Sequence, residues 1–124
     1  MVAKRSEFVD WLLEQMAPLG NVSARAMFGA FGIYLDDFFF ALVHDDTLYL
    51  KADQVNKPRF LKIGAQPFRY HAKGGKVTEM SYFQPPESAL DDCAELIDWA
   101  RASVDAALRA RSAGSSGKSK RHTV

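Results

Sequence analysis

The hydrophobic residues between Ala26 and Lys51 form short runs that are separated by pairs of aspartate. Runs of this length, rich in aromatic and β-branched residues and bounded by turn formers, are typical of antiparallel strands. With Asp36-Asp37 and Asp45-Asp46 as two-residue turns, the pattern predicts a meander with a defined register. The predicted pairs are Leu35 with Phe38, Ile33 with Phe40, Val43 with Leu48, and Ala41 with Leu50.

This register makes both faces of the meander apolar, whereas a hairpin sheet in a soluble protein usually has one polar face. One face would carry Gly32, Tyr34, Phe39, Ala41, Val43, Leu48 and Leu50. The other would carry Phe31, Ile33, Leu35, Phe38, Phe40, Leu42 and Tyr49. Helices in a two-layer domain cover one face only, so we expect the second face to bind a protein partner or another copy of the chain. The predicted interface residues are Phe31, Phe38, Phe40 and Tyr49.

Apolar residues at three- and four-residue steps predict a helix on each side of the meander. Ser6 is a suitable N-cap for the first helix, and Gly20 ends it. Asp53 is a suitable N-cap for the second, but Pro58 removes a helical N–H group. We therefore expect one turn, a kink, and the main helix from about Lys57.

The longest predicted helix closes the folded body. Asp92 and Glu95 form a capping box at its start, and its apolar stripe ends near residues 109–111. Residues 111–124 are rich in serine, glycine and basic residues and contain nothing to bury, which predicts a disordered basic tail. We expect an α+β domain over residues 1–110, with an antiparallel meander sheet, a second hairpin and three helices in two layers.

The second hairpin is predicted around Gly74-Gly75, since glycine tolerates the positive φ angles of a type I′ turn. That turn would pair Lys73 with Lys76, His71 with Thr78, and Arg69 with Met80. A ribbon with such a basic edge and tip could contact a phosphate backbone. The alternative is a solvated sheet edge on which lysines discourage aggregation. The candidate nucleic-acid contacts are Arg69, His71, Lys73 and Lys76, together with Lys118, Lys120 and Arg121 of the tail.

Composition and charge reduce the number of functional classes to which the chain could belong. A chain of 124 residues with 48% hydrophobic and 25% charged residues is typical of one soluble domain. No signal peptide and no apolar run of roughly 20 residues is apparent, so we expect a cytoplasmic protein without membrane contact. Four cations lie in the tail from residue 111, and removing them from the net charge of +1 leaves −3 for the body. A mildly acidic body argues against coating nucleic acid by bulk electrostatics.

The titratable residues do not form a recognisable catalytic pattern. His44, His71 and His122 lie in different predicted elements without the spacing of metal ligands. The aspartate pairs are good turn formers at opposite ends of one strand. Cys93 lies on the apolar stripe of the last helix, where a small buried residue is usual, and has no identifiable histidine partner. We therefore expect no enzymatic activity, metal, cofactor or small-molecule substrate.

Short runs spread over most of the predicted body form an ordered set. They are RAMFG at 25–29, GIY at 32–34, FALV at 40–43, LYLKAD at 48–53, PFRY at 67–70, and MSY at 80–82 before Pro86-Glu87. This set, from about Met16 to Ala107, resembles the TfoX N-terminal domain family.

The resemblance implies a small two-layer α+β domain without enzymatic activity. It also implies an association with TfoX/Sxy-type regulators of natural competence in bacteria, which co-activate transcription alongside the cyclic-AMP receptor protein. Those two-domain regulators have a second, helical domain, and after Arg111 only the tail remains in this chain. We expect a non-enzymatic regulator or adaptor that contacts a protein partner, such as a transcription regulator. The alternative is direct DNA binding through residues 69–76 and the tail.

Overall fold

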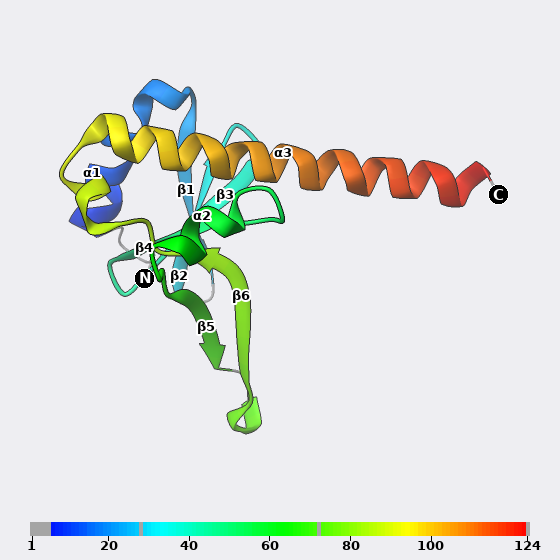
Figure 1. The fold of residues 1–124 in the computed structure, drawn as a ribbon, viewed down its shortest axis with the longest axis horizontal. Helices are drawn as coiled ribbons and strands as arrows, with labels where there is room; N and C mark the ends of the chain where they lie inside the picture. The colour runs from blue at the N-terminus through cyan, green and yellow to red at the C-terminus, as the bar shows by residue number, and fades with distance from the viewer. Residues whose placement is uncertain (1–5, 28, 72, 124) are drawn as a thin grey trace.

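The structure is a computed structural model that describes residues 6–27, 29–71 and 73–123; the side chains of Lys73 and of residues 113–123 are not described. It confirms the predicted α+β fold, in which an antiparallel six-stranded sheet packs with three α-helices (Figure 1). The strands, in spatial order, are β1 (Val22–Met27), β2 (Ala30–Leu35), β3 (Phe38–His44), β4 (Thr47–Lys51), β6 (Val77–Phe83) and β5 (Pro67–His71). The helices are α1 (Glu7–Gln15), α2 (Lys57–Lys62) and α3 (Cys93–Thr123), with 3-10 turns η1 (Ala17–Leu19), η2 (Lys73–Gly75) and η3 (Glu87–Leu90).

The first two helices begin where the sequence predicts. The Ser6 hydroxyl accepts a hydrogen bond from a backbone N–H of the first turn of α1 at 3.2 Å. The Asp53 carboxylate accepts one from the backbone N–H of Val55 at 2.9 Å, and α2 then begins at Lys57. The predicted turn and the start of the main helix at Lys57 are therefore confirmed, with Pro58 in the first turn of α2, where a missing N–H costs little.

Helix α3 differs from the prediction at both ends. The Asp92 carboxylate caps its start by accepting a hydrogen bond from the N–H of Ala94 at 3.0 Å. The Glu95 carboxylate instead accepts a hydrogen bond from the Ser88 hydroxyl at 2.9 Å, so the capping box is incomplete. Helical backbone continues to Thr123, because no proline follows Pro86 to end it. The domain boundary at residue 110 and the disorder of residues 111–124 stay predictions.

No helix in the described ranges combines the length and apolar character needed to cross a membrane.

The meander has the predicted turns but only part of the predicted register. Asp36, Asp45 and Asp46 adopt positive φ angles of 52–54°, as these tight turns require. The confirmed pairs are Leu35 with Phe38, Val43 with Leu48, and Ala41 with Leu50. The predicted pair of Ile33 with Phe40 is wrong, since Ile33 pairs with Ala41.

This displaced pair marks a β-bulge in β3. Tyr34 pairs with Phe39, and its neighbour Ile33 pairs with Ala41, so Phe40 is the extra residue. Phe40 and Ala41 both lie in the core shared with the helices, and each has 0% exposure. A bulge reverses the alternation of side chains along the rest of the strand. The predicted faces are therefore wrong as sets, because each combines residues from both sides of the real sheet.

All three helices pack on the same side of the sheet. Their apolar residues form one core with the side chains that point toward them from the strands. Phe60 of α2, for example, stacks on Phe83 of β6 with ring centroids 5.4 Å apart, and tilts against Trp99 of α3 at 5.0 Å. Burying a side chain of this size stabilises a fold by about 1.5–3 kcal/mol. We call the sheet surface that contacts the helices the helix face.

The second hairpin has a longer loop than the sequence predicts. Lys73–Gly75 form the η2 turn, in which both glycines adopt positive φ angles of 84° and 80°. The register consequently shifts by one residue, and the predicted pairs in this hairpin are wrong. His71 pairs with Val77, and Arg69 pairs with Glu79.

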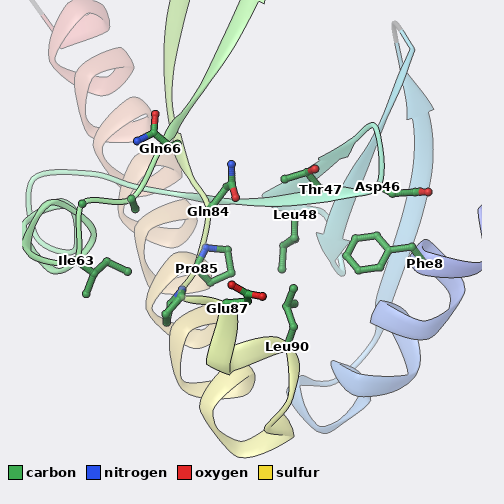
Figure 2. A pocket seen from close by; sticks show the side chains of 13 residues that line it. Phe8, Asp46, Thr47, Leu48, Ile63, Gln66, Gln84, Pro85, Glu87 and Leu90 are labelled. Carbon is green, nitrogen blue, oxygen red and sulfur yellow. The ribbon is translucent and has the colours of Figure 1, made fainter.

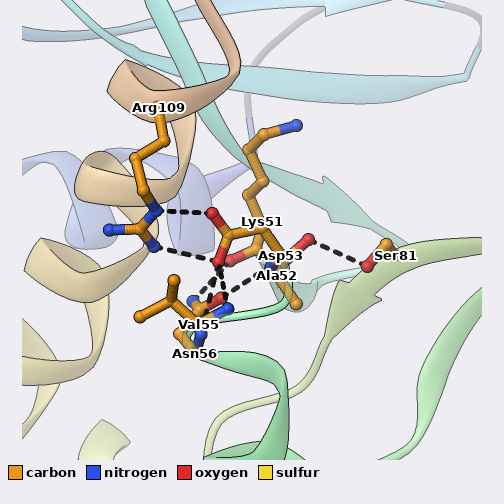
Figure 3. A network of polar contacts seen from close by, with 7 residues as sticks. All are labelled: Lys51, Ala52, Asp53, Val55, Asn56, Ser81 and Arg109. Atoms are coloured by element: carbon orange, nitrogen blue, oxygen red, sulfur yellow. Dashed lines mark hydrogen bonds and ion pairs between the residues drawn. The ribbon is translucent and has the colours of Figure 1, made fainter. Parts of the chain in front are cut away.

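One carboxylate links the loop after β4 to α3 (Figure 3). Asp53 accepts hydrogen bonds from Nε and Nη2 of Arg109 at 2.7 and 2.9 Å. Asn56, only 6% exposed, supports this loop by donating to the carbonyl oxygen of Lys51 at 2.9 Å. The hydrogen bond from Arg109 lowers the pKa of Asp53 from 3.8 to about 2, against the opposing effect of burial.

Gly32 is required by the side chains that cross β2. A Cβ at this position would lie 3.0 Å from Cε1 of Tyr34, 3.1 Å from Sδ of Met27 and 3.1 Å from Cε1 of Phe39. These distances are shorter than ordinary van der Waals contacts, so a larger residue must displace the rings.

Replacing Asp53→Asn should lower the free energy of unfolding by roughly 1–2 kcal/mol near neutral pH, a value discounted for partial exposure. A lowered pKa stabilises the fold fully above the unfolded value of about 3.8, and this contribution disappears as the pH falls through about 2. Urea unfolding at several pH values should show the difference from wild type shrinking in acid. Asp91→Asn, at an exposed carboxylate, is the control. A difference that does not change with pH would contradict the ionic role of Asp53.

Replacing Gly32→Val should destabilise the domain by about 1–3 kcal/mol, because the added methyl groups overpack the rings above β2. Ala26→Val, at an exposed position of the neighbouring edge strand, should change stability by less than about 0.5 kcal/mol. Chemical denaturation of both variants measures the difference. Equal stabilities would show that the rings can move aside.

Candidate functional site: the open face of the sheet

The sheet surface opposite the helix face carries a second apolar cluster, which consists only of strand residues. Its buried members are Leu42, Phe68 and Tyr82, and Phe39, Tyr49 and Met80 pack against them. We call this surface the open face. The register places on it Ser23, Arg25, Met27, Ala30, Gly32, Tyr34, Phe39, Leu42, His44, Thr47, Tyr49, Lys51, Phe68, Tyr70, Thr78, Met80 and Tyr82.

All four tyrosines of the chain lie on the open face. Tyr34 stacks on Phe39 with ring centroids 5.2 Å apart, and Phe39 contacts Tyr82 at 5.5 Å. Tyr49 meets Phe68 edge-on at 5.1 Å. Tyrosine suits such a surface because its ring packs against neighbours while its hydroxyl reaches water. Burial raises the pKa of Tyr82 to about 12, and nearby Tyr34 adds to this effect, so the Tyr82 hydroxyl stays protonated at neutral pH.

The open face is cationic. The guanidinium of Arg25 lies 4.4 Å from the centre of the Tyr34 ring, and the ammonium of Lys51 lies 5.3 Å from that of Tyr82. No acidic residue occupies an open-face position in the described strands. Glu79 is the only one of the 15 Asp and Glu residues within a strand, and its pairing with Arg69 places it on the opposite side.

A hollow of about 590 Å³ lies on this face, within the range of about 300–1,000 Å³ that is usual for ligand sites. Its lining is mainly apolar and includes His44, together with Arg69 and His71, which the register places toward the other side of the sheet. The lining residues are Met27, Ala30, Phe39, Leu42, His44, Phe68, Arg69, Tyr70, His71 and Met80. The hollow therefore offers a mainly apolar surface on the open face.

The four predicted interface residues do not share a face. Phe40 is fully buried in the core under the helices, and Phe31 and Phe38 pack half-buried against the same core. Arg111 covers Phe38, with its guanidinium 4.1 Å from the ring centre. Only Tyr49 lies on the open face. The bulge in β3 is the reason, because it places Leu42 and its partner Tyr49 on the side of the sheet opposite Phe38 and Phe40.

The predicted nucleic-acid contacts are brought together only in part. Arg69, His71 and Lys76 are exposed on the β5–β6 hairpin, which extends away from the rest of the sheet (Figure 1). Arg69 also pairs with Glu79, whose carboxylate oxygen lies 3.4 Å from Nη2, so part of its charge is neutralised. The side chains of Lys73, Lys118, Lys120 and Arg121 lie outside the described part of the chain.

Other places in the described structure lack catalytic arrangements. Cys93 is exposed rather than buried as predicted, and its Sγ lies 3.3 Å from the carbonyl oxygen of Gln15. No group of three or more His, Cys, Asp and Glu side chains that could hold a metal occurs among the described residues. A second hollow, of about 410 Å³, lies between α1 and the segments near residues 63–66 and 84–90 (Figure 2). Its lining includes the carboxylates of Asp46 and Glu87 but no histidine, cysteine, lysine or arginine.

Comparison with known proteins places this architecture in a family. The TfoX N-terminal domain model matches residues 14–107, which include every strand of the sheet. Protein Sxy of Escherichia coli (strain K12) is 32% identical over 99 residues, which are 80% of this chain and 47% of that protein. DNA transformation protein TfoX1 of Aliivibrio fischeri (strain ATCC 700601 / ES114) is 33% identical over 69 residues, which are 56% of this chain and 32% of that protein.

The chain thus spans less than half the length of each of these relatives. The matched region agrees with the ordered runs from Arg25 to Glu87 and with the fold that they imply. The chain therefore belongs to the TfoX N-terminal domain family.

Proposed function

We propose that this chain is a non-enzymatic regulatory domain of the competence-regulator type, which contacts a protein partner through the open face of its sheet. The observation that carries the proposal is the open face itself, with its tyrosines, its cations and its apolar hollow. Family membership supports the regulatory role, since one relative is named a DNA transformation protein. A partner of this kind would be a transcription regulator in the bacterial cytoplasm.

The residue types on the open face support protein binding. Protein interfaces are enriched in tyrosine, methionine and arginine and depleted of acidic residues in their centres. The open face combines Tyr49 and Met80 with Arg25 and has no acid at its described positions. An apolar cluster left in water would stabilise the fold less than one that a partner covers.

The hollow lacks the groups that catalysis would need. General acid–base or covalent catalysis requires a nucleophile or carboxylate placed beside a base. Among the described lining residues, His44 and His71 have no serine, threonine, cysteine or carboxylate beside them in the hollow. This composition supports binding rather than reaction.

Replacing Tyr49→Glu should abolish capture of the protein partner, because a carboxylate at the centre of the open face opposes burial of that face. Purified wild-type and variant proteins would be used as bait in lysate of the native bacterium, with and without nuclease. Leu61→Glu, on α2 with 56% exposure, is the matched control and should capture the partner as wild type does. Circular dichroism melting checks that both variants fold.

The proposal requires a partner protein that withstands nuclease, is retained by Leu61→Glu and is lost with Tyr49→Glu. Retention by Tyr49→Glu would place the contact elsewhere. Loss of all captured protein on nuclease treatment would favour nucleic acid as the direct ligand.

Direct DNA binding by the β5–β6 hairpin is a second candidate function. It is supported by the extension of this hairpin from the sheet and by the exposure of Arg69, His71 and Lys76. The pairing of Arg69 with Glu79 allows a test in two directions. Lys76→Glu should weaken binding to duplex DNA, whereas Glu79→Gln should strengthen it by releasing Arg69.

Fluorescence titration of labelled duplex at several salt concentrations measures both effects. Affinity should fall steeply with salt, and the slope should become shallower by roughly one unit for each phosphate that a variant no longer binds. Absence of binding at low salt, or identical behaviour of both variants, would remove this candidate.

A further inference from the structure

We infer that the ligand of the open face is an acidic protein segment that also carries large apolar side chains. This inference rests on the proposed function and names the chemistry of its partner. It is carried by a row of aromatic side chains that crosses the open face and by two cations that contact its rings.

The row consists of three aromatic rings, from β2, β3 and β6, and two cations, from β1 and β4. Arg25 lies over Tyr34, and Tyr34 stacks on Phe39. Phe39 contacts Tyr82, and Lys51 lies over Tyr82. The two cations therefore contact different rings of the row, Arg25 from edge strand β1 and Lys51 from β4, and the ring of Phe39 also lines the apolar hollow.

Neither Arg25 nor Lys51 is neutralised by a carboxylate in the described structure. Arg25 and Lys51 contact aromatic rings and form no ion pair with a described residue, and Figure 3 shows the Lys51 side chain directed away from Asp53. The acids of the chain lie in helices, turns and loops, apart from Glu79. Carboxylates on a partner could therefore pair with both cations while an apolar side chain enters the hollow that Phe39 shares with the row.

A second copy of the chain is a poor ligand for this face. Two open faces placed against each other would bring like charges together and would offer no carboxylates to pair with them. Single-stranded nucleic acid is also less suitable, because bases need free aromatic faces on which to stack. Tyr82 is 6% exposed and Phe68 is 9% exposed, so both rings are already covered by their neighbours, whereas Tyr70 on β5 is 50% exposed.

Selection from a random peptide library of about 12 residues, displayed on phage, tests the inference before the natural partner is identified. Wild-type protein should enrich peptides in which Asp or Glu flanks Leu, Phe or Trp. Synthetic copies of these peptides, followed by fluorescence anisotropy, should bind the Arg25→Glu, Lys51→Glu double variant at least about tenfold more weakly. The Lys57→Glu, Lys62→Glu double variant has the same charge change on α2 and should bind as wild type does.

The outcomes separate this inference from the proposed function. In one outcome, the enriched peptides depend on Tyr49 but show no acidic bias and bind the Arg25→Glu, Lys51→Glu variant as tightly as wild type. That result would overturn the inference and leave the proposed function standing. If no enriched peptide depends on Tyr49, both fall. Binding of a thymidine oligonucleotide of about 15 residues that is lost in the Arg25→Glu, Lys51→Glu variant would assign the face to nucleic acid and overturn the inference. Thermal melting confirms that each variant is folded.

Discussion

The bulge at Phe40 is the constraint on which both faces of the sheet depend. In a strand without the bulge, successive side chains would point strictly to alternate sides of the sheet. Phe38 and Phe40 could then not share a side with Val43. With the extra residue, Phe40 and Ala41 both enter the core under the helices, where each is fully buried. The same irregularity brings Leu42 to the open face. A single extra residue in one strand therefore completes the core and forms the hollow.

The two apolar surfaces differ in the type of aromatic residue that they use. The helix face and its helices bury Phe40, Phe60, Phe83 and Trp99, whereas every tyrosine lies on the open face. Burying a hydroxyl without a hydrogen bond costs free energy, so a closed core favours phenylalanine. A surface that is exposed until a partner arrives favours tyrosine, because its hydroxyl remains hydrated while its ring stays packed. This difference distinguishes the open face from a hydrophobic core surface that simply lacks a packed helix.

The elements of the fold were predictable from the sequence because they depend on local chemistry. Asp-Asp pairs located the meander turns, and Asp53 with Pro58 located the start of α2. The bulge was not predictable, since the run FFFALV alternates equally well in either register and only packing under the helices selects one. The prediction of the hairpin loop was wrong for a similar reason, because Gly74-Gly75 permits both a two-residue turn and the longer η2 turn. Of the four predicted interface residues, Tyr49 lies on the open face because it pairs with Leu42, which follows the bulge.

The fold separates the residues that stabilise it most from those on the open face. The largest fully buried side chains, such as Phe40, Phe60 and Leu12, all lie in the core that the helices share. Two arginines fix the position of α3 over that core, away from the open face. Arg109 binds Asp53, and Arg111 covers the ring of Phe38. Partly exposed residues of the open face contribute less to stability, because their burial is incomplete. Their identity can therefore vary at little cost to folding, while substitutions under the helices act on the fold itself.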